Sequence, residues 1–544
     1  MTYAQKKQVI GAMQRLVPAH APVPQSPEVL AQLTELTADL IRIYQGEGKL
    51  RENPFAEASL RRIHLYEDLI RSEIAGKTIL VTGGEGCVGQ AFITSMIDLG
   101  AEQIVCVDKA KLAPAQLIQS PGLVYQTTDV RDLTAILDTF ATVQPQIIFH
   151  LAAQRLPGLA EIEVRETISS NLIGTCNIIE ACQTYQVEKC IFSSTGKASR
   201  YYTADVYAAS KKFCEWLFAK AALAGNTVYA AVRFTHILDN SSIEDKVSKG
   251  IENGLVNLHK PDIDLLPQNV SEANYLLLNA LVETVPHRLK ILIVRDLGWP
   301  IDLLELVLYK IAKSGKKVPL YFNGLQAGYD EPFFHGQFDP TLGTEVNPLI
   351  SAIKDVDRTY DKFGTMIITK MSAFSIDELD RQVAALTQLT TDLSFPEAEL
   401  KGVQAKGIAA VATSIFKQIT PAKSLNVLSL GVNPKLFAAQ GIDVKIHRTV
   451  LGIILRGVFG RLDQIKDYPL EEATKLLGVV ELLQLIPELA TEVSYLKSFV
   501  ARTLTQTSAL EFDGETLLKE KTEIRVNLVG ETSVTENRVN QLAA

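Results

Sequence analysis

Tyr207 and Lys211 could form a proton-transfer pair. They lie within the sequence Tyr-Ala-Ala-Ser-Lys, and residues at i and i+4 share one face of a helix. A free phenol ionises near pH ~10, and a neighbouring ammonium lowers that pKa. We therefore expect Tyr207 to exchange a proton with a substrate hydroxyl, with Lys211 tuning the phenol and Ser194 or Thr195 binding the substrate oxygen. Such a pair is usually an ordinary part of an amphipathic helix, so the catalytic interpretation depends on a second motif upstream.

The second motif is a glycine-rich turn that could bind a pyrophosphate. Residues 82–89 read Thr-Gly-Gly-Glu-Gly-Cys-Val-Gly, after a short apolar run and before a helix-like segment. Glycines at this spacing allow a tight turn, close approach of the backbone to a phosphate, and close packing of helix on strand. The residues expected to hold the dinucleotide here are Gly83, Gly86, Cys87, Val88 and Gly89.

Residues after the next apolar runs complete the expected dinucleotide site. Asp108 ends the second run, where a carboxylate can hydrogen-bond both ribose hydroxyls of an adenosine, which favours NAD. Lys109 and Lys111 follow and could offset its charge, so NADP stays possible. Asp129 and Val130, after the third run, could reach the adenine. Ala152 and Ala153, after the fourth run, are small and leave room for the cofactor. Lys211 can also hold the nicotinamide ribose.

Short apolar runs alternate with longer amphipathic segments from about residue 77 to 235. This alternation predicts an α/β fold with a doubly wound parallel sheet of Rossmann type. Strands are expected at 78–81, 104–107, 123–126, 147–150, 190–193 and 228–232. Further mixed elements are expected beyond 240, including 291–294 and 319–322.

The chain is long enough for two or three domains. We expect a helical N-terminal extension over 1–75, with one helix starting at Ser26-Pro27 and another over 56–74. The central domain would cover 76–395, with a Rossmann core over about 76–240 and a small α/β substrate part over about 233–395. A mainly helical accessory domain is expected over 396–544, in which 522–529 and 532–534 could pair as strands or stay frayed.

The composition excludes several classes of protein. The net charge of −8 without a basic block argues against a nucleic-acid partner. The N-terminus lacks the apolar core of a signal peptide, and no apolar run is long enough to span a membrane, so a cytoplasmic protein is expected. The six cysteines are expected to be reduced and buried, and the eight scattered histidines predict no metal site.

Together these features resemble the extended short-chain dehydrogenase/reductase superfamily, most closely its CapD-type polysaccharide-biosynthesis branch, which includes UDP-N-acetylglucosamine 4,6-dehydratases. The likeness runs from about residue 65 to 390 and includes the segments 150–155, 171–175, 261–264, 271–273, 296–300, 324–328 and 375–379. It implies a nicotinamide dinucleotide, a nucleotide-sugar substrate and a homo-oligomer. It also implies a cofactor role for Asn171 and substrate roles for Arg155, Ser194, Arg233 and His236.

The sequence departs from that family where the substrate would be held and converted. Thr195-Gly196-Lys197 stands where the dehydratases have Thr-Asp-Lys. The resemblance implies that the missing Asp protonates the departing C6 hydroxyl and that Lys197 removes the C5 proton. Leu265 and Gln326 replace arginines and Tyr329 replaces a glutamate. Because paired arginines suit a diphosphate, the substrate could lack that group or bind it differently.

Three hypotheses remain open. The first is an NAD(P)-dependent enzyme that oxidises a hydroxyl of a nucleotide-sugar-like substrate transiently, as dehydratases and epimerases do. The second is a plain dehydrogenase or reductase on a non-sugar substrate, which would consume free NAD(P). The third is a dinucleotide-binding scaffold, which would keep its function if Tyr207 were changed to Phe.

Overall fold

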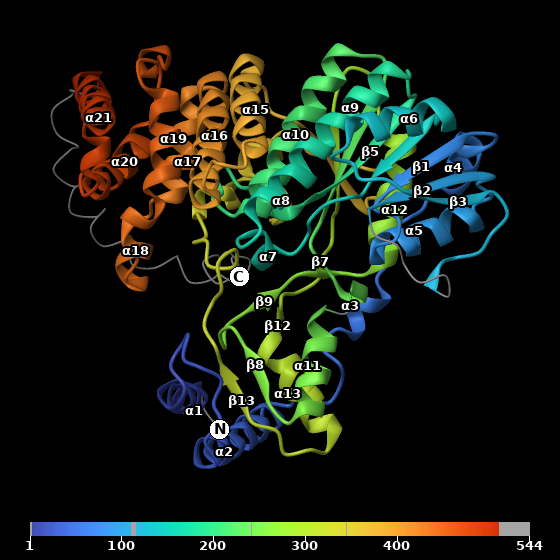
Figure 1. Cartoon of the computed structure of the whole chain (residues 1–544). Helices are drawn as coiled ribbons and strands as arrows, with labels where there is room; N and C mark the ends of the chain where they lie inside the picture. The colour runs from blue at the N-terminus through green and yellow to red at the C-terminus, as the bar shows by residue number, and fades with distance from the viewer. Residues whose placement is uncertain (1–2, 110–115, 241, 344, 511–544) are drawn as a thin grey trace.

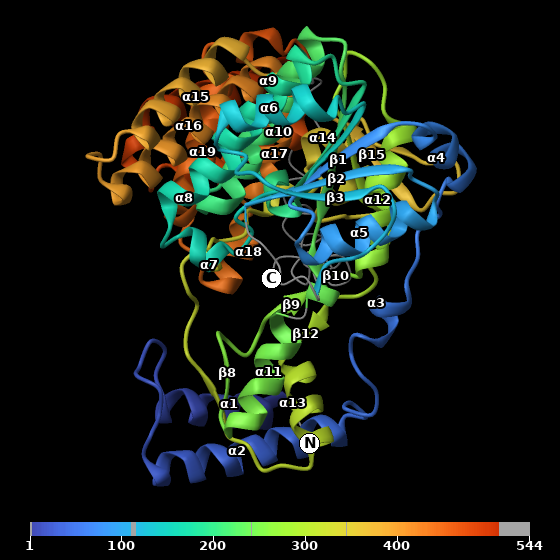
Figure 2. The ribbon, with the colours of Figure 1, turned by 45° about the vertical axis from the view of Figure 1, so that its right-hand side comes forward.

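The computed structural model describes residues 3–109, 116–240, 242–343 and 345–510, which form two lobes (Figure 1). The larger lobe holds a central sheet with a bundle of C-terminal helices beside it. The smaller lobe is joined to the sheet by the segment that precedes the first strand, β1 (Thr78–Thr82), and by segments that follow β6 (Val228–Phe234). Figure 2 shows the same two lobes from a second direction.

The central sheet has nine strands and confirms the predicted Rossmann-type fold. Its order is β14-β15-β11-β6-β5-β4-β1-β2-β3, and the seven strands from β11 to β3 are parallel. The bounds are β1 Thr78–Thr82, β2 Gln103–Asp108, β3 Leu123–Thr127, β4 Ile147–His150, β5 Lys189–Thr195, β6 Val228–Phe234, β11 Lys290–Val294, β14 Thr359–Tyr360 and β15 Met366–Lys370.

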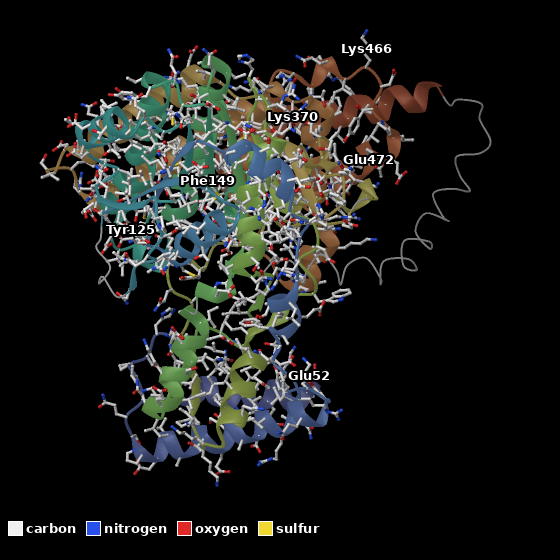
Figure 3. The ribbon with its side chains drawn as sticks, turned by 90° about the vertical axis from the view of Figure 1, so that its right-hand side faces the viewer. Glu52, Tyr125, Phe149, Lys370, Lys466 and Glu472 are labelled. Atoms are coloured by element: carbon white, nitrogen blue, oxygen red, sulfur yellow. The ribbon has the colours of Figure 1, made fainter. Side chains whose placement is uncertain are left out.

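Helices cover both faces of this sheet, which explains why its inner strands are continuous apolar runs. One face carries α4 (Glu67–Ile74), α5 (Cys87–Asp98) and α12 (Val270–Glu283), which pack against one another. The other carries α6 (Leu133–Val143), α9 (Gly174–Thr184) and α10 (Val206–Ala224). Figure 3 shows Phe149 of β4 inside this lobe, whereas Glu52 and Lys466 lie at the surface.

The first two helices pack into the smaller lobe. Its core joins α1 (Tyr3–Leu16) and α2 (Pro27–Gly46) to α11 (Ser242–Asn253), α13 (Leu303–Ser314) and the parallel pair of β8 (Val256–Leu258) and β13 (Leu320–Phe322). The helix predicted from Ser26-Pro27 is confirmed, with the Ser26 side chain accepting a hydrogen bond from the Val29 amide. The element expected over 319–322 is found here as the strand β13.

The single helix predicted over 56–74 is wrong. The segment forms α3 (Ala56–Leu60) and α4, separated by an extended stretch. Tertiary hydrogen bonds replace the helical ones: Asn269 donates to the Ala58 and Arg61 carbonyls, and Asn279 bonds both the His64 carbonyl and the Tyr66 amide. These partners lie some 200 residues away in the chain, so local sequence could not predict the break.

The described part of the C-terminal region is helical, with an apolar core of its own. Its helices are α15 (Ile376–Thr391), α16 (Glu397–Gln418), α17 (Pro421–Gly431), α18 (Pro434–Gln440), α19 (Arg448–Val458), α20 (Leu470–Leu483) and α21 (Ala490–Leu510). The segments 522–529 and 532–534, like Lys111, lie outside the described residues. Among the described residues no helix is long and apolar enough to cross a membrane.

Candidate active site

The glycine turn follows β1 and lies against the segment that follows β4. Gly83 has φ +72°, and a Cβ there would lie 2.6 Å from the Ala152 nitrogen. A Cβ on Gly89 would lie 2.5 Å from the Gly83 carbonyl oxygen, so helix α5 packs directly on the turn. Gly86 is the N-cap of α5 and brings no capping side chain. The first amides of the helix, at Cys87 and Val88, therefore form the kind of cradle that binds a pyrophosphate.

Three carboxylates and two cations surround the ends of β2 and β3. Lys109 Nζ lies 2.6 Å from a Glu166 oxygen, and Arg131 pairs with both Glu166 and Asp129. Burial alone would raise the pKa of Asp129, but its bonds to Arg131 lower it overall. Both cations are thus already paired beside Asp108, which leaves little positive charge for a 2′-phosphate.

Tyr207 and Lys211 lie on the first turns of α10, at the carboxyl edge of the sheet. Thr195 ends β5, and its hydroxyl lies close enough to the Tyr207 phenol to lower the pKa of that phenol. Lys211 is 3% exposed, and its ammonium donates to the Ser193 carbonyl at 2.9 Å. The structure therefore brings Tyr207, Thr195 and Lys211 together around the end of β5.

Burial dominates the protonation of both groups. It raises the pKa of Tyr207 to about 12, with only a partial offset from Thr195. In the protein alone, burial therefore outweighs the lowering of the phenol pKa expected from Lys211, whose ammonium donates to the Ser193 carbonyl. Burial also lowers the pKa of Lys211 to about 8.

Asn171 lies in a one-turn π-helix, Ser169–Ile173, between α8 (Val164–Ile168) and α9. π-turns inside helices often mark functional sites. The Asn171 side-chain amide accepts a hydrogen bond from the Gln154 amide and donates one to the Gln154 carbonyl. It also donates to the Ser210 hydroxyl at 2.8 Å. It thereby ties the segment after β4, which holds Ala152 and Ala153, to the helix that carries Tyr207.

The position of the missing acid is filled by an apolar side chain. A Cβ on Gly196 would overlap the Leu349 Cδ2 methyl group. The neighbouring Lys197 ammonium lies 2.6 Å from the Asp205 carboxylate and donates to the Gly328 carbonyl at 2.7 Å. Lys197 is thus held as a paired cation rather than presented as a free amine.

Arg233 and Ser194, predicted to contact substrate, lie instead in a buried network. Arg233 is fully buried and binds Glu215 through two 2.7 Å bonds and the Leu349 carbonyl through a third. Ser194 donates to the same Glu215 carboxylate at 2.7 Å, and Lys354 lies 3.8 Å from it. The guanidinium and hydroxyl serve to neutralise and satisfy a buried carboxylate.

The remaining predicted residues lie around the site. Arg155 is exposed, and its positive charge lowers the pKa of both the Cys87 thiol and the Tyr207 phenol in opposition to their burial. His236 is half-buried in β7 (His236–Ile237), where burial lowers its pKa. Val130 packs against the helix start at Gly174.

Sequence reasoning missed several residues that shape the site. Asp205 is the N-cap of α10, a role that its place before an apolar helix could have indicated. Glu215, Leu349 and Glu161 gave no comparable signal, because each acts through partners distant in the chain. Tyr329 stacks on His259 and lies 5.3 Å from the Lys197 ammonium, measured to its ring centroid.

Residues 79–329 match the protein family described as "Polysaccharide biosynthesis protein". The probable polysaccharide biosynthesis protein EpsC of Bacillus subtilis is 26% identical over 305 residues, which cover 54% of this chain and 49% of that protein. A UDP-N-acetylglucosamine 4,6-dehydratase (inverting) of Campylobacter jejuni is 30% identical over 169 residues, covering 30% of this chain and 49% of the relative. The chain thus spans about half the length of these curated relatives.

A solved structure of Pen from Bacillus thuringiensis aligns with a TM-score of 0.46 at 18% identity, covering 54% of this chain and 88% of that one.

Proposed function

We propose that this chain binds NAD and transiently oxidises a hydroxyl of a nucleotide-sugar-like substrate. The resemblance to the CapD-type branch of the extended short-chain dehydrogenases/reductases, which is confirmed across residues 79–329, supports this proposal. The observation that carries the proposal is the position of Tyr207 and Lys211 on α10 next to Ser193 and Thr195 at the end of β5, at the same edge of the parallel sheet as the glycine turn. Relatives named for polysaccharide biosynthesis support a role of that kind.

The residues present fit a dinucleotide. The amides of Cys87 and Val88 would hold the pyrophosphate, Asp108 the adenosine ribose, and Asp129 and Val130 the adenine. Lys211 would hold the nicotinamide ribose, and Arg155 is placed to add charge near the pyrophosphate. Bound NAD supplies a hydride acceptor. The ion pairs of Lys109 and Arg131 with acidic neighbours favour NAD over NADP.

The residues of the chain divide the proton-transfer work. Thr195 holds the substrate oxygen against the Tyr207 phenol, and Tyr207 carries the hydroxyl proton. With a pKa of about 12 the phenol alone is a poor base at neutral pH. Lys211, with a pKa of about 8, is the nearby cation whose charge can favour the phenolate once ligands reorganise the site.

The geometry favours a reaction without loss of water. The family resemblance implies that elimination of water needs an acid at the position of Gly196 and a base at the position of Lys197. Here Leu349 fills the space beside Gly196, and Lys197 is paired with Asp205. We therefore infer epimerase-type rather than dehydratase-type chemistry. The absence of two expected arginines, at Leu265 and Gln326, favours a plain dehydrogenase on a substrate without a diphosphate as the second candidate.

The test incubates the purified protein with NAD and a panel of UDP-sugars, including UDP-N-acetylglucosamine, and follows products by NMR and NADH by absorbance. Epimerised sugar without net NADH supports the proposal. Net NADH formation supports the second candidate, and a 4-keto-6-deoxy product overturns the inference against elimination. If the protein binds neither NAD nor NADP, both the proposal and the second candidate are overturned. The expected homo-oligomer and cytoplasmic location remain proposals.

A further inference from the structure

We propose that the C-terminal helical domain positions the helix that carries Tyr207, acting through Glu161 and Lys401. This inference rests on the proposed function only in taking Tyr207 as the proton-transfer residue. Helices α15 and α16 lie outside the matched residues 79–329, and in Figures 1 and 2 they stand beside α10. Helix α16, which begins at Glu397, also lies beyond the segments that carry the family resemblance.

Glu161 joins the two domains. It follows α7 (Pro157–Ala160), and its side chain is 4% exposed. One carboxylate oxygen accepts a 2.8 Å hydrogen bond from the amide of Val206, the first residue of α10, and the other pairs with Lys401 of α16. The Val206 amide is one of the helix N-terminal donors that have no partner within the helix. Glu161 thus fixes the helix start one residue before Tyr207.

Two further contacts hold α16 along α10. Gln404 is 1% exposed, and its side-chain amide donates to the Val206 carbonyl at 3.3 Å. A Cβ on Gly407 would lie 2.9 Å from Phe213 Cζ, so only a glycine lets the two helices approach so closely. The position of α16 therefore determines where the first turn of α10 lies.

A second anchor joins α8 to the last turn of α15 and to the connection that follows it. The Arg165 guanidinium donates to the carbonyls of Leu389, Thr390 and Phe395. Helix α8 leads into the π-turn that holds Asn171. The C-terminal helices thus contact both α10, which carries Tyr207, and α8, which leads to Asn171.

Lys401 matters because Glu161 is buried. A buried carboxylate that loses its cation either binds a proton or withdraws toward water, and both weaken its bond to the Val206 amide. The stem of Glu161 also supports the loop that receives Lys197, since a Cβ on Gly328 would lie 3.2 Å from Glu161 Cγ. Misplacement of a reacting group by about 1 Å can cost about 100-fold in rate.

The first arm of the test is amide hydrogen exchange over residues 205–215 in the full chain, which needs no substrate. Lys401→Met is expected to speed exchange at the Val206 amide by about 5- to 20-fold. Lys406→Met, an exposed lysine on the same helix, should leave it unchanged. Glu161→Gln should match Lys401→Met, and the double variant should add little because both remove one ion pair. Lys401→Gln carries the same expectation if Lys401→Met fails to fold.

The second arm measures turnover on whichever substrate the panel identifies. Lys401→Met should lower kcat at least about 5-fold with KM and the Kd for NAD within about twofold of wild type, and Lys401→Arg should restore kcat. Unchanged exchange at Val206 in Lys401→Met, or equal effects in Lys406→Met, would overturn the inference. If the wild-type protein turns over nothing while the exchange result holds, the proposed function fails and the positioning role stands.

Discussion

Filling the space beside Gly196 should destabilise the protein, because Leu349 already occupies it. Gly196→Ala adds a methyl group that overlaps Leu349 Cδ2 and lies 3.6 Å from the Phe234 carbonyl oxygen. Leu349 is 1% exposed, and the hydrogen bond from the buried Arg233 to its carbonyl holds its backbone in place, so only a change of side-chain rotamer among packed neighbours could relieve the overlap. Overpacking at such a site costs about 1–3 kcal/mol.

The reciprocal change should leave a cavity. Leu349→Ala is expected to cost about 2–5 kcal/mol. In the double variant the new methyl group occupies part of that cavity, so the total cost should fall below the sum of the single costs by about 1–3 kcal/mol.

The assay is urea unfolding, at one pH, of the parent protein, the two single variants and the double variant. Fluorescence of Trp216, which is 1% exposed on α10, reports the sheet domain when the exposed Trp299 is replaced by Phe in every variant. Gly402→Ala is the control, because a Cβ there meets nothing within 4 Å, and it should stabilise by about 0.4–1 kcal/mol. The reasoning is refuted if Gly196→Ala is as stable as the parent, or if the two single costs add within about 0.5 kcal/mol.

Four further outcomes are expected. Tyr207→Phe should lower kcat by about 100-fold or more while the Kd for NAD stays within about twofold, and equal loss of both would contradict a role in proton transfer. Asp108→Asn should weaken NAD binding and bring the Kd values for NADH and NADPH closer together, as measured by fluorescence titration. An unchanged ratio of these two Kd values would exclude Asp108 from the ribose site. Because the pKa of Lys211 is lowered to about 8, its ammonium is present below that pH and lost above it. We therefore expect kcat/KM to fall above pH about 8 and this limb to disappear in Lys211→Arg. Arg233→Met should destabilise by about 3–5 kcal/mol by leaving Glu215 buried without its main cation, and Glu215→Gln with Arg233→Met should recover part of that loss in the same urea assay.

The glycine turn and the acid that ends the second strand were predictable in position because their signals are local. A glycine that must adopt positive φ, such as Gly83, and an acid that ends the next strand, such as Asp108, lie at fixed distances from the strands that position them. The strands themselves were visible as apolar runs because helices cover both faces of the sheet. Arg233 and Ser194 were misassigned because a polar residue at a strand end can face the site or the interior, and only Glu215, on another element, decides which.

The sequence by itself determined the parallel sheet, the glycine turn and the Tyr207–Lys211 spacing, since each depends on contacts within a few residues or on a repeating pattern of burial. Only the tertiary structure decided the protonation of that pair, because burial by distant segments sets it. Tertiary packing also decided that Leu349 replaces the acid beside Gly196, that Lys197 is paired, and that α16 reaches the start of α10 through Glu161. Each of these joins residues remote in the chain, and their energy arises only when packing excludes water between them.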